Sequence, residues 1–192
     1  EGSIFTGGAL IQWLRDELNL IQDAQETEHI AFSIENSNDV AIIPAFSGLG
    51  APYWNMNAYG TIFGLRRDTN KKHIIRASLE SIAFQVNDLI NSISSDLKIN
   101  LESLKVDGGA TANNFLMQFQ SDVSKINIVR PKIIENTAYG AAMLTGIGLG
   151  IWDNTSQINK KYDRTFKPSV TKKNRKLLID KWNKAINICS KY

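Results

Sequence analysis

Apolar side chains recur at helical spacing in several parts of the chain. Residues 8–21 contain one such face and predict an amphipathic helix, formed by Leu10, Leu14, Leu18 and Ile21. From residue 72 the same spacing predicts a long helix, whose apolar face is made by Ile75, Leu79, Ile82, Val86 and Leu89. Shorter helices are predicted at residues 25–33, 112–123, 137–149 and 171–190. The 137–149 helix is rich in Ala and Gly, so we expect it to pack closely.

Short apolar runs between these helices predict strands at residues 40–43, 60–65, 104–106 and 126–129. Because strands alternate with helices, the pattern predicts an α/β fold with a sheet covered by helices. The connection over residues 45–59, AFSGLGAPYWNMNAY, is long and rich in glycine and aromatic side chains. A loop of this kind inside a compact domain is typical of a functional segment.

The chain has 192 residues, of which 43% are hydrophobic and 21% are charged. This composition is typical of ordinary globular proteins. The formal charge of +3, from 22 basic and 19 acidic residues, is too small and too scattered to indicate a nucleic-acid groove. No apolar run is long enough to cross a bilayer. We therefore expect no nucleic-acid partner and no membrane insertion.

Cysteine and histidine usage argues against metal and disulfide chemistry. Cys189 is the single cysteine, and its helical spacing from Trp182 and Ala185 predicts a buried structural thiol. His29 and His73 stand far apart without a partnering ligand, so no zinc site is expected. This composition suits a reducing cytoplasm.

The stretch LKVDGGATANN at residues 104–114 places a glycine pair between a predicted strand and a predicted helix. Such a junction can bind phosphate, because a helix N-terminus offers free N–H groups and glycine lets the backbone come close. The stretch fits neither the Walker A pattern nor the dinucleotide pattern G-x-G-x-x-G. From spacing alone, Gly108 and Gly109 are explained equally well by a structural corner or by a nucleotide site with Asn113 reaching back over it.

Other motifs favour the nucleotide site. Residues 60–80, GTIFGLRRDTNKKHIIRASLE, resemble the signature of the FGGY carbohydrate kinases. Within that family, residues 1–16, 44–54, 106–122 and 137–152 resemble the glycerol kinase branch, so the resemblance covers nearly the whole chain. It implies an actin-like ATPase, or ribonuclease H-like, α/β fold with a mixed sheet flanked by helices.

The resemblance also implies how the chain is organised. Residues 1–192 would form the C-terminal, nucleotide-binding domain of a longer protein. Residues 1–35 would be a helical entry segment from the missing N-terminal half, and residues 171–192 the C-terminal helix. The whole protein would be a cytoplasmic homo-oligomer that transfers a phosphoryl group from ATP to glycerol, with Mg²⁺ bound mostly by the missing half.

Five residues receive a nucleotide-binding role from the resemblance. The backbone at Gly8 would approach the phosphates, Ile11 and Gln12 would approach the nucleotide, and Gly109 and Asn113 would contact the adenosine. No residue matches the catalytic Asp or the polyol-binding Arg, Glu and Tyr, which are expected upstream of Glu1. The chain by itself is therefore expected to have no catalytic residue, no metal ligand, weak ATP binding and no kinase activity.

Several alternatives remain from the sequence. The protein could phosphorylate another polyol or sugar, or it could be an actin-like assembly protein that binds ATP without phosphorylating a metabolite. An unrelated NAD-binding α/β domain is a third alternative. Asp107 could brace the glycine turn or act through Mg²⁺-bound water, whereas Arg76 and Glu80 at i,i+4 spacing are interpreted as a structural pair. Asn55 and Tyr59 depart from the usual glycerol kinase loop, where they could alter subunit contacts or regulation.

Overall fold

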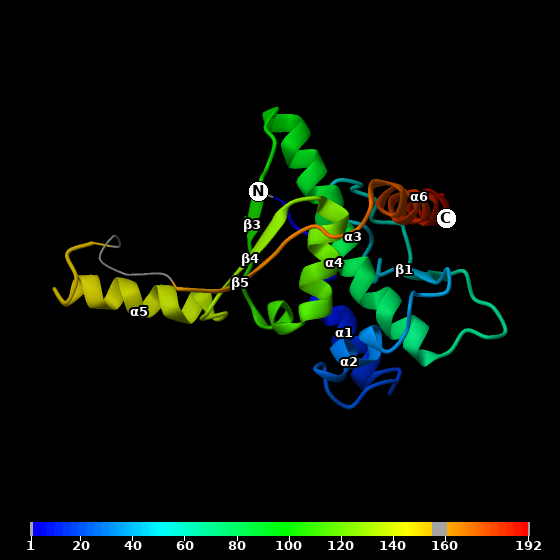
Figure 1. Ribbon diagram of the computed structural model, residues 1–192, viewed down its shortest axis with the longest axis horizontal. Coiled ribbons are helices and arrows are strands. Elements are labelled where there is room, and N and C mark those ends of the chain that lie inside the picture. The colour runs from blue at the N-terminus through cyan, green and yellow to red at the C-terminus, as the bar shows by residue number, and fades with distance from the viewer. Residues whose placement is uncertain (1, 155–160, 192) are drawn as a thin grey trace.

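The computed structural model of the chain describes residues 2–154 and 161–191 and has the predicted alternation of helices and strands (Figure 1). The helices are α1 (Gly8–Asp16), α2 (Glu26–Phe32), α3 (Lys71–Leu97), α4 (Asn114–Ser124), α5 (Asn136–Gly148) and α6 (Lys172–Cys189), with a short 3₁₀ helix η1 (Gly109–Ala112). The strands are β1 (Ala41–Ile43), β2 (Thr61–Phe63), β3 (Ser103–Lys105), β4 (Asn127–Pro131) and β5 (Tyr162–Phe166). The expectation of an α/β fold is confirmed.

The strands form two small sheets. β1 and β2 pair antiparallel across the long 45–59 loop, whereas β3, β4 and β5 form a second sheet in that order. β3 is parallel to β4, and β4 is antiparallel to β5, so the second sheet is mixed as expected. The parallel pair is joined through η1 and α4, since parallel strands need a crossover connection. This crossover places the glycine turn at the end of β3.

β5 is the strand that the apolar pattern did not predict. Its sequence YDRTF is exposed except for Phe166, which is buried opposite Ile128 of β4. A single inward-facing residue leaves no alternation to recognise, so the strand is defined by its pairing with β4 rather than by its own sequence.

The core is organised around α3, which is contacted by α1, α2, α4 and β1 (Figure 1). Asn70 caps α3, because its side chain accepts from Lys72 N and the His73 ring accepts from Asn70 N. The Phe84 ring stacks on Trp182 of α6 with ring centroids 5.1 Å apart. Trp182 and Cys189 are each 1% exposed, which confirms the predicted buried thiol.

The helix predicted over residues 8–21 is shorter than expected. α1 ends at Asp16, and Asn19 adopts a left-handed backbone with φ of 52° that no helix continues through. Ile21 is still buried, because the turn returns its side chain to the core, but Leu18 is 39% exposed. The apolar spacing therefore predicted the burial of Leu10, Leu14 and Ile21 correctly, was wrong for Leu18, and overestimated the length of the helix.

The expectation that the 137–149 helix packs closely is wrong for this chain. α5 extends away from the other elements (Figure 1), and Leu144 and Leu149 are 69% and 72% exposed. A helix with apolar residues on all sides is normally buried. The exposed surface of α5 is therefore available for contact with another part of the protein or with a partner.

Candidate functional site

A cavity of about 840 Å³ lies between α1, α2, η1 and the start of α4, with Leu79 and Ile82 of α3 among its lining residues. This volume is in the range of small-molecule sites, roughly 300–1,000 Å³. The cavity is lined by all five residues for which the family resemblance implies a nucleotide-binding role, namely Gly8, Ile11, Gln12, Gly109 and Asn113. They come from segments about a hundred positions apart, and their contact with a nucleotide stays a prediction.

The glycine turn presents bare backbone to this cavity. Gly108 has φ of 82°, in the region that favours glycine, and its carbonyl accepts from Thr111 N at 3.0 Å and Thr111 Oγ1 at 2.7 Å. A Cβ atom added at Gly109 or at Gly8 would meet no atom within 4 Å. Both glycines therefore leave open space beside the backbone, as a flat ligand surface requires.

The Asn113 side chain makes two hydrogen bonds within the fold. Its side chain caps α4, because Oδ1 accepts from Leu116 N at 2.9 Å. Its Nδ2 donates to Thr27 Oγ1 at 3.0 Å, and Thr27 in turn donates to the carbonyl of Ala24. A primary amide keeps one further N–H and one further lone pair after these two bonds. Asn113 therefore joins α4 to α2 and retains one donor and one acceptor position.

A second link between α2 and α4 was not found from the sequence. The Glu28 carboxylate accepts from Asn114 N and from Asn114 Nδ2, the latter at 3.0 and 3.2 Å. Asn114 Oδ1 accepts from Arg130 Nη2 of β4 at 3.1 Å. Glu28 and Asn114 both line the cavity, so the link forms part of its wall. The sequence signal was weak, because Glu28 is one of several acidic residues in a polar stretch.

Arg130 fixes the glycine turn to the sheet. Its Nη1 donates to the carbonyls of Thr111 at 2.8 Å and Ala112 at 3.2 Å. Its Nε and Nη2 donate to Asp163 Oδ2 of β5 at 2.9 and 2.7 Å. Together with the bond to Asn114, all five guanidinium N–H groups are used. Arg130 therefore connects β5, the turn and the start of α4.

The N-termini of α1 and α4, which both lie at the cavity, differ in how they are capped. α1 begins after Gly7 with no side-chain cap and no acidic residue in its first turn. α4 begins with its first N–H groups taken by Asn113 and Glu28. Gln12 and Arg15 lie on exposed positions of α1 at the cavity, and Arg15 pairs with Asp16 at 2.7 Å. The anion-attracting end that remains open is therefore that of α1.

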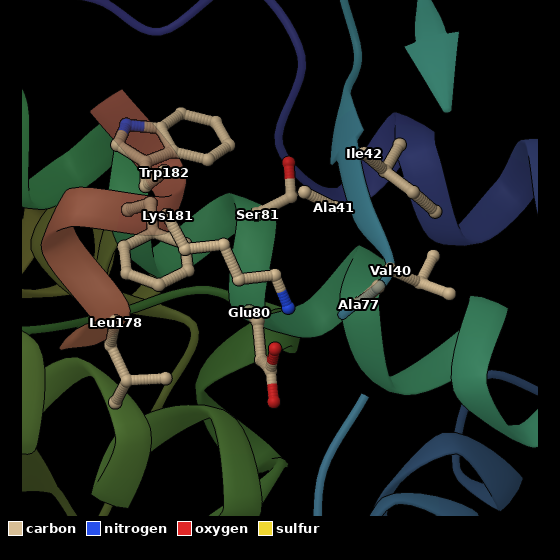
Figure 2. A pocket seen from close by; sticks show the side chains of 10 residues that line it. Val40, Ala41, Ile42, Ala77, Glu80, Ser81, Leu178, Lys181 and Trp182 are labelled. Carbon is tan, nitrogen blue, oxygen red and sulfur yellow. The ribbon is translucent and has the colours of Figure 1, made fainter. Parts of the chain in front are cut away.

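Other buried polar groups lie outside the cavity. Arg76 pairs with Glu80 at 2.9 Å and also donates to the carbonyl of Ala31, which confirms the structural pair expected from their spacing. A separate space of about 10 Å³, sufficient for about one water molecule, lies between β1, α3 and α6. Figure 2 shows Lys181 of α6 extending toward Glu80 there, and burial lowers the pKa of Lys181. This space is too small for a nucleotide.

Asp88 forms a polar centre beneath the 45–59 loop. Its Oδ2 accepts from the Tyr53 hydroxyl at 2.7 Å and from Trp182 Nε1 at 2.5 Å, which joins the loop to α3 and α6. Burial raises the pKa of Asp88, and the two donors partly oppose that rise. In the same loop, Asn55 donates to the carbonyl of Ser190 at 3.2 Å. Residues of this loop therefore brace the C-terminal helix.

The described residues do not fit a metal site of their own. Within residues 2–154 and 161–191, no three His, Cys, Asp or Glu side chains converge on a point that could hold an ion. None of the helices in this part of the chain combines the length and apolar character needed to span a membrane.

The fold defines the class of protein. The structure superposes on the gluconate kinase of Lactobacillus acidophilus with a TM-score of 0.80 and 22% identity, over 98% of this chain and 39% of that one. At that identity the likeness establishes the fold, which is the actin-like, ribonuclease H-like ATPase fold of the sugar kinases. The fold implied by the sequence motifs is therefore confirmed.

The family follows from closer similarities. Residues 1–149 match the family described as "FGGY family of carbohydrate kinases, C-terminal domain". The glycerol kinase of Shewanella piezotolerans is 51% identical over 97% of this chain, and the ADP-bound glycerol kinase of Plasmodium falciparum is 39% identical over 97% of it, with a TM-score of 0.87. The chain belongs to the FGGY family of carbohydrate kinases. It spans 38% of the length of each of these two relatives.

Proposed function

We propose that the chain supplies the nucleotide site of an ATP-dependent glycerol kinase, which converts ATP and glycerol to ADP and glycerol 3-phosphate. One observation carries the proposal: the five residues implied by the motifs converge on one cavity of nucleotide size. The similarity to glycerol kinases over 97% of the chain supports the choice of glycerol as acceptor.

The nucleotide would lie with its adenosine on the bare backbone at Gly109 and its phosphates at the start of α1. Asn113 would offer the adenosine its remaining N–H and lone pair. Gly8 would let the phosphates reach the uncapped N–H groups of α1, where the helix dipole favours negative charge. Ile11 and Gln12, which follow on the same helix, would contact the nucleotide between these two ends.

Phosphoryl transfer would need groups that lie outside these 192 residues. A hydroxyl acceptor requires a base or an orienting carboxylate near that hydroxyl. We propose that another domain of the protein supplies the catalytic Asp, the polyol site and the protein ligands of Mg²⁺. The exposed apolar surface of α5 supports contact with such a domain. The whole protein would be a cytoplasmic homo-oligomer.

Two measurements test the proposal. In the complete protein, glycerol should stimulate ADP release from ATP in a coupled assay, and glycerol 3-phosphate should form in equal amount. The 192-residue chain should bind ADP weakly in isothermal titration calorimetry and form no glycerol 3-phosphate. Phosphorylation of another polyol in preference to glycerol would contradict the acceptor. NAD displacing a fluorescent ATP analogue at comparable concentration would contradict the nucleotide site.

An actin-like assembly protein would give a different result. It would hydrolyse ATP without dependence on glycerol and would sediment as filaments when ATP is added. Glycerol-dependent turnover without sedimentation would exclude that alternative.

A further inference from the structure

Three helices begin at the cavity, but the first turn of α2 already holds two acidic residues, Glu26 and Glu28. This leaves the N-termini of α1 and α4 as the two that could attract a phosphate group. α1 begins at Gly8 and α4 begins at Asn114, and both residues line the cavity. The cavity alone therefore allows a nucleotide to lie in either of two directions, with its phosphates at α1 or at α4.

The Glu28 carboxylate occupies the start of α4. It accepts from the first backbone N–H of the helix, at Asn114, and from the Asn114 side chain at 3.0 and 3.2 Å. Asn113 takes the N–H of Leu116 in the same turn. The start of α1 carries no such group, because no side chain caps it and its first turn holds no acidic residue.

The position of the Glu28 carboxylate is fixed by Asn114, which is itself bound by Arg130. Asn114 Oδ1 is bound by Arg130, which fixes the direction of the Asn114 amide so that its Nδ2 faces Glu28. All five Arg130 N–H groups are used, so the arrangement is anchored to β4 and β5. The neighbouring Thr27 to Asn113 bond fixes the same part of α2. A negative charge therefore stays at this end of the cavity.

We propose that Glu28 determines the direction in which the nucleotide binds. Its charge repels phosphate from α4, and its oxygens take the N–H group that phosphate would use. The phosphates are thereby left to α1, and the adenosine is left to Gly109 and Asn113. This inference rests on the proposed function, because it assumes that a nucleotide occupies the cavity.

A purely structural link between α2 and α4 would behave differently. Glu28→Gln keeps an oxygen that can accept from Asn114 N, but it removes the charge. If Glu28 only joins the two helices, loosening the wall should raise the KM for ATP and leave binding of phosphate alone unchanged. If Glu28 repels phosphate, the variant should gain affinity for an anion that carries no adenosine.

The experiment uses the complete protein and three probes: ADP, adenosine and tripolyphosphate. In calorimetry, Glu28→Gln should bind tripolyphosphate about fivefold more tightly than the unaltered protein, as expected for about 1 kcal/mol of repulsion at a helix terminus. Adenosine affinity should change less than twofold. Glu35→Gln is the matched control, because Glu35 is exposed beyond the end of α2 and does not line the cavity.

Steady-state kinetics give a second readout. Binding in the wrong direction is non-productive, so kcat and the KM for ATP should fall together in Glu28→Gln while kcat/KM stays unchanged. Glu28→Asp keeps the charge and should behave as the unaltered protein toward tripolyphosphate. If Glu28→Gln fails to fold by circular dichroism, Glu28→Ala provides the same anion measurement.

Unchanged tripolyphosphate affinity in Glu28→Gln, or a raised KM with unchanged kcat, would overturn the inference. Failure of the unaltered protein to bind ADP would instead overturn the proposed function.

Discussion

Arg130→Lys is the substitution that most directly tests how the glycine turn is held. The lysine keeps the positive charge beside Asp163 but has one nitrogen in place of a planar fork. A single ammonium group cannot reach Asp163, the two turn carbonyls and Asn114 at once, because the guanidinium reaches them with five N–H groups that point in different directions. The substitution therefore leaves the ion pair in place and releases the turn.

The expected loss follows from which acceptors are buried. Hydrogen bonds from a charged donor contribute about 1.5–3 kcal/mol each when the acceptor is left without a partner. Ala112 is exposed, so water replaces its bond, whereas Thr111 is buried and Asn114 is half-buried. Two acceptors at the lower end of the range give about 3 kcal/mol of lost stability. If ADP must order the released turn when it binds, at a cost of about 1 kcal/mol, the affinity for ADP should weaken about fivefold.

Urea denaturation and ADP titration measure the two effects in the complete protein. Arg164→Lys is the matched control, because Arg164 of β5 pairs with Arg130 in the sheet and lies over the same Phe166 ring, but it is exposed and the turn carbonyls of Thr111 and Ala112 are bound by Arg130. It should change stability by less than about 0.5 kcal/mol. An unchanged denaturation midpoint together with an unchanged Kd for ADP in Arg130→Lys would refute the reasoning.

Two further substitutions test the amide at the cavity and the buried carboxylate. Asn113→Ala should weaken ADP binding and also destabilise α4 by about 1 kcal/mol, because it removes both the amide and the helix cap. Asn113→Ser removes the amide but keeps a capping oxygen. If ADP binding weakens in Asn113→Ala but not in Asn113→Ser, the amide does not contact the ligand. Asp88→Ala should cost about 2–5 kcal/mol in urea denaturation, since the Tyr53 hydroxyl and Trp182 Nε1 both lose their acceptor. Because burial raises the pKa of Asp88 in the folded chain, its contribution to stability is largest below the unfolded pKa of about 4 and is lost as pH rises through the raised value. Asp88→Asn should flatten that part of the stability profile, and an unchanged profile would contradict the assignment to Asp88.

Much of the candidate site could be assembled from the sequence because its members lie in motifs. Gly8 and Gln12 occur in one recognisable stretch, and Gly109 and Asn113 in another. Glu28 and Arg130 carried no such signal. Glu28 is one acidic residue in a polar stretch, and Arg130 is the charged residue near the end of an apolar strand. The role of each depends on a partner in another element, which helical or strand spacing does not reveal. The two hydrogen bonds that the Asn113 amide makes within the fold were not predicted either, since capping and the Thr27 bond require the positions of two helices.

Spacing of apolar residues by itself determined the order of the helices and of strands β1 to β4, the α/β class and the burial of residues such as Cys189, because each of these reflects local periodicity. Tertiary structure decided the rest. It ended α1 at Asp16, formed β5 by pairing with β4, and left α5 exposed although its sequence is apolar on every side. It also placed Glu28 on the start of α4 and left the start of α1 open. These outcomes depend on which distant groups meet, and periodicity along a single element carries no information about its partner.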